Sequence, residues 1–197
     1  SEDLPGGAGN VVLNLKALGA DVWAVGRVGD DKEGSRLKHL LEEEGIDTSG
    51  VFIQKNVKTP LKNRLIADSQ QLIRVDQECI TPLSSDVETE VMSYIIDCIE
   101  SFEVIAISDY SKGFLSKSFL RRLLDLASKY NIPTIVDPKG GDFTKYRGAM
   151  QGYSAYSAPK FGDYWRYALT LINTKAFPLP TGYVRHPFNT IVHVGFS

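Results

Sequence analysis

The strongest constraint on the fold of this chain is a strand–helix–strand pattern that fills about 35 residues near its middle. Residues 104–108 and 133–137 are short apolar runs, and between them apolar side chains recur at helical spacing over 116–130. A connection of this length joins two parallel strands through a right-handed crossover. The pattern therefore predicts an α/β fold, a mainly parallel sheet with helices on both faces.

The same alternation of helix and strand begins at the start of the chain. Apolar residues recur at helical spacing over 11–18, and a buried strand is predicted over 22–26. Two further amphipathic helices are predicted over 34–45 and 87–99. The first 149 residues thus extend the α/β pattern well beyond its central unit.

The pattern changes between residues 51 and 76. Short strand candidates occur at 51–53, 62–67 and 71–76, and we predict that they form a small antiparallel excursion from the main sheet. Lys62 and Arg64 alternate on one face of the middle candidate. They form either an anion site or the basic edge of an exposed strand.

Charge and cysteine content exclude several classes of partner. The 197 residues carry 22 basic and 24 acidic side chains, a net charge of −2 and a pI near 5.9, which argues against nucleic acid and anionic membranes. No run approaches the roughly 20 apolar residues that cross a bilayer, and the first residues lack a secretory pattern, so we expect a cytoplasmic protein. Cys79 and Cys98 are interpreted as free thiols, and no metal-ligand spacing is found.

Polar clusters follow two of the predicted strands at the point where each strand ends. Asp109 and Lys112 lie in the first cluster, and Asp137 and Lys139 lie in the second. Ligands of open α/β sheets bind beyond the carboxyl ends of the strands. A carboxylate accepts hydroxyl protons and an ammonium attracts phosphate, so these pairs suit polyhydroxylated, phosphorylated ligands. The alternative is that polar, glycine-containing loops simply follow buried strands, as they do in many α/β proteins.

A third candidate is the glycine-rich segment Pro5-Gly-Gly-Ala-Gly-Asn10, which directly precedes the first predicted helix. Gly6 and Gly7 allow the backbone to approach a ligand closely, and free N–H groups at a helix start can face polar oxygens. The segment does not match GxGxxG, and no GxxxxGK[ST] motif occurs in the chain. A Rossmann dinucleotide site and a P-loop are therefore both disfavoured.

Taken together, the motifs resemble those of one known family. The segments that carry the resemblance are 5–20, 26–31, 62–64, 70–76, 108–113 and 137–149. In this order they resemble the pfkB, or ribokinase-like, carbohydrate kinases, and most closely the branch that acts on heptose 7-phosphate. The resemblance covers residues 1–149 and implies a ribokinase-like kinase domain with a small β lid over about 51–76.

The resemblance also implies an activity and a set of binding residues. It implies phosphoryl transfer from ATP, with Mg²⁺, to the anomeric hydroxyl of D-glycero-β-D-manno-heptose 7-phosphate, a step in lipopolysaccharide core synthesis in the cytoplasm. The lid of this family often joins two copies, which implies a homodimer. By the same resemblance, substrate binding falls to Gly6, Gly7, Asn10, Lys62, Arg64, Asp109 and Lys112, and the nucleotide-side rim to Asp137 and Lys139.

Three features of the family are missing from the sequence. They are a first strand with an acidic sugar-binding residue before Ser1, a strand that ends in Thr-Pro-Asn, and a Gly-Ala-Gly-Asp loop that supplies the catalytic aspartate. No catalytic residue is therefore assigned, and we expect this 197-residue form to lack turnover. Two alternatives stay open: a kinase for another sugar, or a non-catalytic remnant that binds sugar phosphate or pairs with another subunit.

Residues 150–197 differ in composition from the rest. They hold four basic residues, one acidic residue and ten aromatic residues, whereas residues 1–149 hold 18 basic and 23 acidic residues. Some of the possible codons for residues 152–158, read one base later, would encode Ala-Thr-Leu-Leu-Thr, which is the continuation expected of the heptose branch. We therefore hypothesise that this atypical tail is a shifted-frame translation, which reading the coding DNA in all three frames would test.

Overall fold

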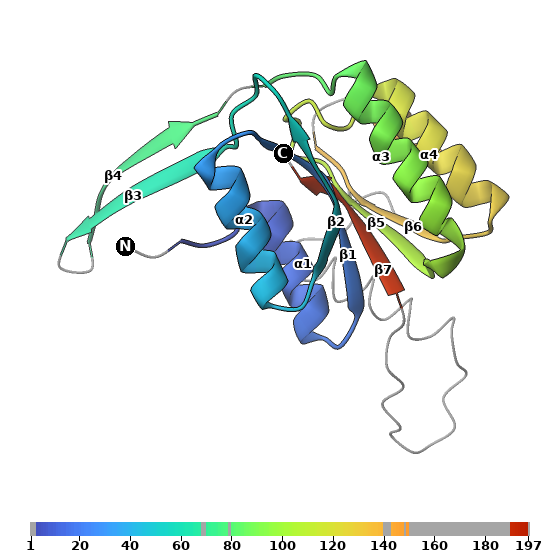
Figure 1. Ribbon diagram of the computed structural model, residues 1–197, viewed down its shortest axis with the longest axis horizontal. Coiled ribbons are helices and arrows are strands. Elements are labelled where there is room, and N and C mark those ends of the chain that lie inside the picture. The colour runs from blue at the N-terminus through green and yellow to red at the C-terminus, as the bar shows by residue number, and fades with distance from the viewer. Residues whose placement is uncertain are drawn as a thin grey trace, which may run out of the picture.

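The computed structural model describes residues 3–67, 70–78, 80–139, 143–147, 149 and 190–196. Helices and strands alternate along the chain as the sequence predicts (Figure 1). In chain order the elements are α1 (Gly7–Ala17), β1 (Asp21–Gly29), α2 (Lys32–Glu43), β2 (Asp47–Gln54), β3 (Leu61–Ala67), β4 (Gln70–Gln77), α3 (Ser85–Cys98), the 3₁₀ helix η1 (Ile99–Ser101), β5 (Val104–Ser108), α4 (Lys117–Lys129), β6 (Thr134–Asp137), η2 (Phe143–Tyr146) and β7 (Thr190–Phe196).

A five-stranded sheet forms the centre of the molecule. Its strand order is β2-β1-β7-β5-β6, and every neighbouring pair is parallel. Helices α1 and α2 cover one face, and α3 and α4 cover the other (Figure 1). The predicted crossover is present, because β5 and β6 pair in parallel with α4 between them in the chain. The predicted α/β architecture is confirmed.

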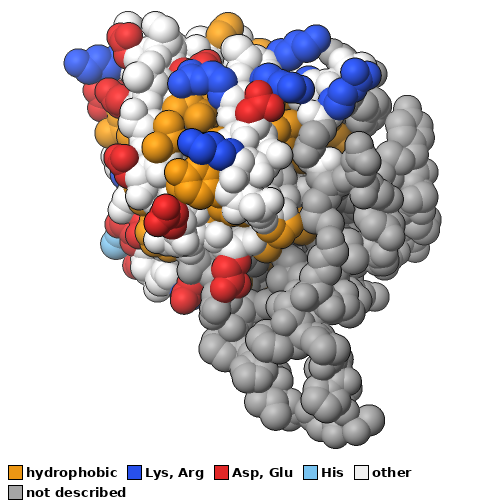
Figure 2. All heavy atoms as spheres, turned by 90° about the vertical axis from the view of Figure 1, so that its right-hand side faces the viewer, with side chains coloured by type: hydrophobic (Ala, Val, Ile, Leu, Met, Phe, Trp, Pro, Cys, Tyr) orange, Lys and Arg blue, Asp and Glu red, His pale blue; other side chains and the backbone are white. Residues whose placement is uncertain are grey.

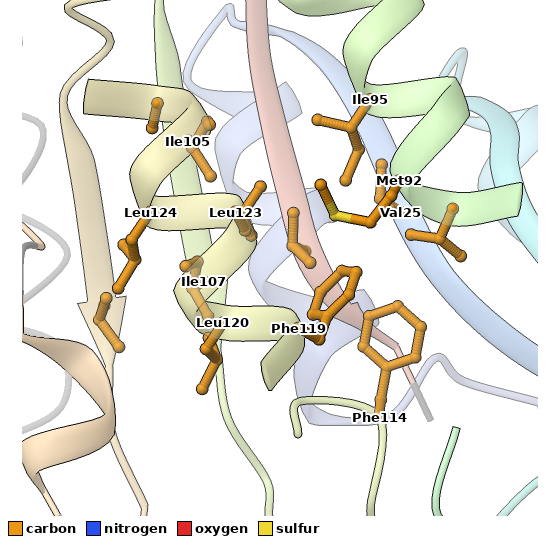
Figure 3. Close-up of a cluster of buried hydrophobic side chains, with 14 of the residues drawn as sticks. Val25, Met92, Ile95, Ile105, Ile107, Phe114, Phe119, Leu120, Leu123 and Leu124 are labelled. Carbon is orange, nitrogen blue, oxygen red and sulfur yellow. The ribbon is translucent and has the colours of Figure 1, made fainter. Parts of the chain in front are cut away.

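Each face of the sheet buries its own apolar cluster, because successive side chains of a strand point to opposite faces. On β5, Ile105 and Ile107 belong to the cluster under α3 and α4, whereas Val104 and Ala106 belong to the cluster under α1 and α2. Figure 3 shows the first cluster, in which the Phe114 and Phe119 rings meet at 5.5 Å between centroids. Packing on both faces thus fixes the strands whose carboxyl ends carry the polar segments.

Side chains determine where three of the helices begin. Asp31 caps α2, Ser84 caps α3 and Ser116 caps α4, each by accepting a backbone N–H from the first turn. Helix α1 differs, because Gly6 at its N-cap offers no side-chain acceptor. Among the described residues, the first turn of α1 therefore has no side-chain cap, and its N–H groups can face polar oxygens.

The antiparallel excursion is smaller than the sequence predicts. Residues 51–53 were expected to belong to it, but they lie in β2, which pairs in parallel with β1. The reason is burial: Val51 is 3% exposed beside β1, and the strand continues over eight residues. The excursion is the two-stranded antiparallel sheet of β3 and β4, which we call the lid and which extends away from the main sheet in Figure 1.

The middle of the main sheet is occupied by a strand that the sequence analysis did not assign. β7 pairs in parallel with β1 on one side and with β5 on the other. At its carboxyl end Gly195 has φ +146°, and a Cβ there would collide with the Ser108 carbonyl. Only glycine fits this position, because of both the conformation and the close approach. Residues 150–189, which include the segment of the shifted-frame hypothesis, lie outside the described residues.

The surface carries charges of both signs. On the side that bears α3 and α4, Lys and Arg side chains lie mainly along the upper edge, and Asp and Glu lie to the left and below (Figure 2). This mixture agrees with the small net charge of the chain. Among the described residues, none of the helices combines the length and the apolar character that crossing a membrane requires.

Candidate functional site

The two polar clusters meet at the carboxyl edge of the sheet, as the parallel strands predict. Ser108 at the end of β5 pairs with Asp137 at the end of β6, and the Asp109 N–H donates to the Asp137 carbonyl at 3.0 Å. Residues 108–113 and 137–139 therefore line one continuous edge, which we call the rim. The rim is where an open α/β sheet binds its ligands.

Asp109 is the most densely bonded side chain of the rim, and only 5% of it is exposed. Its Oδ1 accepts the Ser111 N–H at 2.6 Å. Its Oδ2 accepts the Tyr146 hydroxyl at 2.6 Å and the Lys145 ammonium at 2.5 Å. A buried carboxylate needs such partners to remain charged. Sequence reasoning missed Lys145 and Tyr146, although both lie within the segment 137–149 that carries the family resemblance.

The rim holds a second carboxylate, that of Asp137, in a setting that disfavours its ionisation. Burial raises the pKa of Asp137, the nearby Asp109 carboxylate raises it further, and Lys139 opposes both effects. Burial and the hydrogen bond to Asp109 likewise raise the pKa of the Tyr146 hydroxyl. The rim therefore concentrates negative charge that favours a cation or a hydroxyl donor as its ligand.

The glycine-rich helix entry lies against the rim. A Cβ on Gly7 would lie 2.5 Å from the Tyr110 Oη, so the ring of Tyr110 occupies the space that a side chain would need. The Lys139 ammonium lies 5.6 Å from the centre of the same ring. Gly6 faces open space, and Asn10 is exposed on α1. Three predicted segments, 5–10, 108–113 and 137–139, are thus brought together.

The lid contributes Lys62 to this arrangement. Lys62 on β3 and Lys112 on the rim both form ion pairs with Glu78, which follows β4. Lys62 also lies 3.4 Å from Asp76. The hydrogen bond to Glu78, which outweighs the opposing effect of burial, raises the pKa of Lys62. Arg64 is not part of this group: it is exposed, two residues further along β3, and stands opposite Arg74.

A buried arginine, Arg27, is hydrogen-bonded to the backbone of the rim loop. Arg27 on β1 is 2% exposed, and its guanidinium donates to the Gln54 Oε1 and the Pro82 carbonyl, both at 2.9 Å. It also donates to the carbonyls of Thr81 and Lys112. One side chain thus joins β1, β2, the segment before α3 and the rim loop. Sequence reasoning assigned it no role, although it lies within the segment 26–31 of the family resemblance.

The base of the lid is fixed by a second network. The Asp31 carboxylate accepts the Thr59 hydroxyl at 2.7 Å and the Thr59 N–H at 2.9 Å, and the Thr59 hydroxyl oxygen accepts the Gly29 N–H at 2.9 Å. Burial acts to raise the pKa of Asp31, but hydrogen bonds from Thr59 and Gly34 lower it overall. An open hollow of about 640 Å³ lies between this base and Glu78.

Comparison with solved structures defines the class of fold. The chain is similar to the tetrameric inhibited form of phosphofructokinase-2 from Escherichia coli, with a TM-score of 0.54 and 21% identity, over 73% of this chain and 46% of that one. It is also similar to the potassium complex of the same enzyme, with a TM-score of 0.53, over 70% of this chain and 43% of that one. The fold is therefore that of the ribokinase-like sugar kinases.

Sequence comparison gives the family. The model of the pfkB family of carbohydrate kinases matches residues 2–159, and the chain belongs to this family. The match extends ten residues beyond Ala149, into the segment predicted to be an atypical tail.

Two curated relatives are both named Bifunctional protein HldE. The protein from Trichlorobacter lovleyi is 42% identical over 149 residues, and that from Campylobacter jejuni (strain RM1221) is 45% identical over 144 residues. These alignments cover 75% and 73% of this chain. The chain spans about 30% of the length of each relative.

Proposed function

We propose that this chain forms the sugar-binding part of a kinase that transfers the γ-phosphate of ATP to the anomeric hydroxyl of D-glycero-β-D-manno-heptose 7-phosphate. The identity to HldE proteins supports this substrate class. The observation that carries the proposal is the meeting of the α1 entry with two consecutive strand ends at one rim. The proposed setting is the cytoplasm, in lipopolysaccharide precursor synthesis.

In this proposal different residues bind different parts of the sugar phosphate. The uncapped first turn of α1, with Gly6, Gly7 and Asn10, faces the sugar, and the Asp109 carboxylate accepts a sugar hydroxyl. Lys62 and Lys112 attract the phosphate already present on the sugar, with Arg64 further along the lid. Phosphoryl transfer requires alignment, charge neutralisation and exclusion of water, which a rim covered by a cationic lid supplies.

The nucleotide side of the proposed site consists of Asp137 and Lys139. Burial and, to a smaller extent, the nearby Asp109 carboxylate raise the pKa of Asp137; a hard cation would offset both effects, so the carboxylate oxygens fit Mg²⁺. When bound with ATP, Mg²⁺ neutralises charge on the phosphates. Lys139 is exposed beside Asp137, where it can meet a phosphate oxygen. No residue is proposed as the general base.

A second candidate function is supported by the rim and the lid. Their residues are proposed to contact the sugar and its phosphate, and these contacts suffice for a sugar-phosphate-binding module without turnover. The lid adds a possible pairing surface, since it exposes Leu65, Ile66, Leu72, Ile73 and Val75. We propose a homodimer through this surface, because exposed apolar strands favour association. The remaining alternative is a kinase that acts on another sugar.

Titration calorimetry separates these functions. Heptose 7-phosphate and a non-hydrolysable ATP analogue are each titrated into the 197-residue chain, and ADP formation is measured with both substrates present. The kinase proposal expects binding of both ligands and turnover. Binding of the sugar phosphate without the ATP analogue supports the non-catalytic module. Stronger binding of another sugar phosphate would make that compound the proposed substrate in place of heptose 7-phosphate. Absence of any sugar-phosphate binding contradicts both candidates.

A further inference from the structure

Glu78 joins the lid to the rim through two lysines. Its Oε1 pairs with the Lys62 ammonium on β3, and its Oε2 pairs with the Lys112 ammonium on the rim loop. Each oxygen thus serves a cation from a different part of the fold. The side chains of Glu78 and Lys112 are only 21% and 20% exposed, so this contact is partly shielded from solvent. These two cations are the ones proposed to bind the phosphate of the sugar.

The carboxylate is a strong partner for both cations. Hydrogen bonds from Lys112 and Lys62 lower the pKa of Glu78 to about 2, so it is ionised throughout the neutral range. A phosphate that reached these lysines would therefore meet a fixed negative charge. Asp76, which pairs with both Lys62 and Arg74, adds a second one.

The two ends of this link differ in rigidity. The rim end is held from behind, because the buried Arg27 guanidinium donates to the Lys112 carbonyl at 3.1 Å. The lid end lies on a two-stranded sheet whose residues are almost all exposed. Breaking the Glu78 contact would therefore loosen the lid, which stays attached at its base through Thr59, while the rim stays in place.

We propose that Glu78 is a specificity-determining residue whose carboxylate occupies the place of the ligand's phosphate, so that a phosphate monoester must displace it from Lys62 and Lys112. The proposal rests on the sugar-phosphate function above. A phosphate group supplies more charge and more acceptor oxygens than a carboxylate, so it can replace Glu78 on both lysines. An unphosphorylated sugar cannot make this exchange. Glu78 thus lowers the affinity for every phosphate ligand. When no phosphate ligand is bound, Glu78 links the lid to the rim.

The test uses inorganic phosphate as a probe in titration calorimetry on the whole chain. Glu78→Gln is expected to bind phosphate about five- to tenfold more tightly than the unaltered chain, because the competing pairs are lost. Glu78→Asp keeps the charge and is expected to show no such gain. Adding Lys112→Met to Glu78→Gln is expected to abolish the gain. Glu100→Gln, an exposed site at the opposite end of β5, controls for net charge.

Equal or weaker phosphate binding by Glu78→Gln, with unchanged circular dichroism, would overturn the proposal. Glu78 would then only link the lid to the rim and would not compete with phosphate. Should Glu78→Gln fail to fold, Lys112→Met alone decides: unchanged phosphate affinity contradicts the exchange. The same variants are titrated with heptose 7-phosphate and with the ATP analogue. A gain for the ATP analogue alone contradicts the assignment to the sugar's phosphate. If the unaltered chain binds no heptose 7-phosphate, the proposed function fails. The ratio of the inorganic phosphate affinities of Glu78→Gln and the unaltered chain still tests the exchange.

Discussion

The rim and the lid carry the same kinds of charged residue but are held in very different ways. The rim is built on buried strands, and Asp109 alone accepts three hydrogen bonds. The lid has almost no buried side chains, and the described contacts that tie it to the rest are the Glu78 pair with Lys112 and the Thr59 network at its base. The proposed site thus has one half that is held by buried contacts and one half that has few of them.

The largest expected effect comes from the buried support of the rim. Replacing Arg27 with Met removes the hydrogen bonds that its buried guanidinium donates to the Gln54 side chain and to partly buried carbonyls, which is expected to cost about 3 kcal/mol or more of unfolding free energy. Urea denaturation measures this loss. Arg36→Met, at an exposed surface pair with Asp3, is the control and should change stability by less than about 1 kcal/mol. Equal effects of the two variants would show that Arg27 does not support the rim.

A smaller effect is expected where α1 meets the rim. A methyl group on Gly7 would lie 2.5 Å from the Tyr110 hydroxyl oxygen and 2.6 Å from the nearest ring atom, and moving that ring is expected to cost about 1–3 kcal/mol. Sugar-phosphate binding should weaken as well, because Tyr110 belongs to the rim. Gly6→Ala is a matched control, since a Cβ there meets nothing within 4 Å. Thermal unfolding and calorimetry of both variants test this contact, and a stable, fully binding Gly7→Ala variant would contradict it.

The lid base and the rim should respond to pH with opposite signs. The pKa of Asp31 is lowered in the folded state, so its contribution to stability is present above the unfolded value of about 3.9 and is lost as the pH falls through the folded value. The pKa of Asp137 is raised, so stability is lost as the pH rises from about 3.9 through that raised value.

At pH 7 Asp31→Asn should therefore lower the melting temperature, whereas Asp137→Asn should raise it while weakening ligand binding. Melting curves of both variants and the unaltered chain at pH 3, 5 and 7 measure these differences. Shifts of the same sign at pH 7 would contradict the contrast between the two regions.

The smallest effect on stability is expected on the lid surface. Ile73→Thr and Leu65→Thr replace exposed side chains and should change the unfolding free energy by no more than about 0.5 kcal/mol. If the lid joins two copies, both variants should weaken self-association in sedimentation velocity runs. Ile96→Thr, at an exposed position on α3, is the control. Self-association that is unaffected by the lid variants would argue against dimerisation through the lid.

Local rules predicted the parts of this fold that depend on local sequence. Helical spacing located α1 to α4. The strand ends placed Asp109 beside Asp137 because parallel neighbours share one edge. The motifs also identified the family, which the comparisons confirm.

Contacts between distant residues could not be predicted in the same way. Residues 51–53 belong to the main sheet because of their pairing with β1, which their short apolar run does not reveal. The pairing of Lys145 and Tyr146 with Asp109 spans more than 35 residues of chain. Arg27 bonds to carbonyl groups more than 50 residues away, and a lone arginine within a strand gives no signal of such a role.

The position of β7 has a consequence for the order of assembly. β1 and β2 form one half of the main sheet and β5 and β6 the other, and these halves share hydrogen bonds only through β7 among the described strands. Yet β7 is the last of these strands to leave the ribosome. During synthesis the two halves can form separately, but the sheet cannot close until this late segment arrives. Its closure brings together contacts of very large sequence separation, which makes slow, late folding the expected behaviour of this chain.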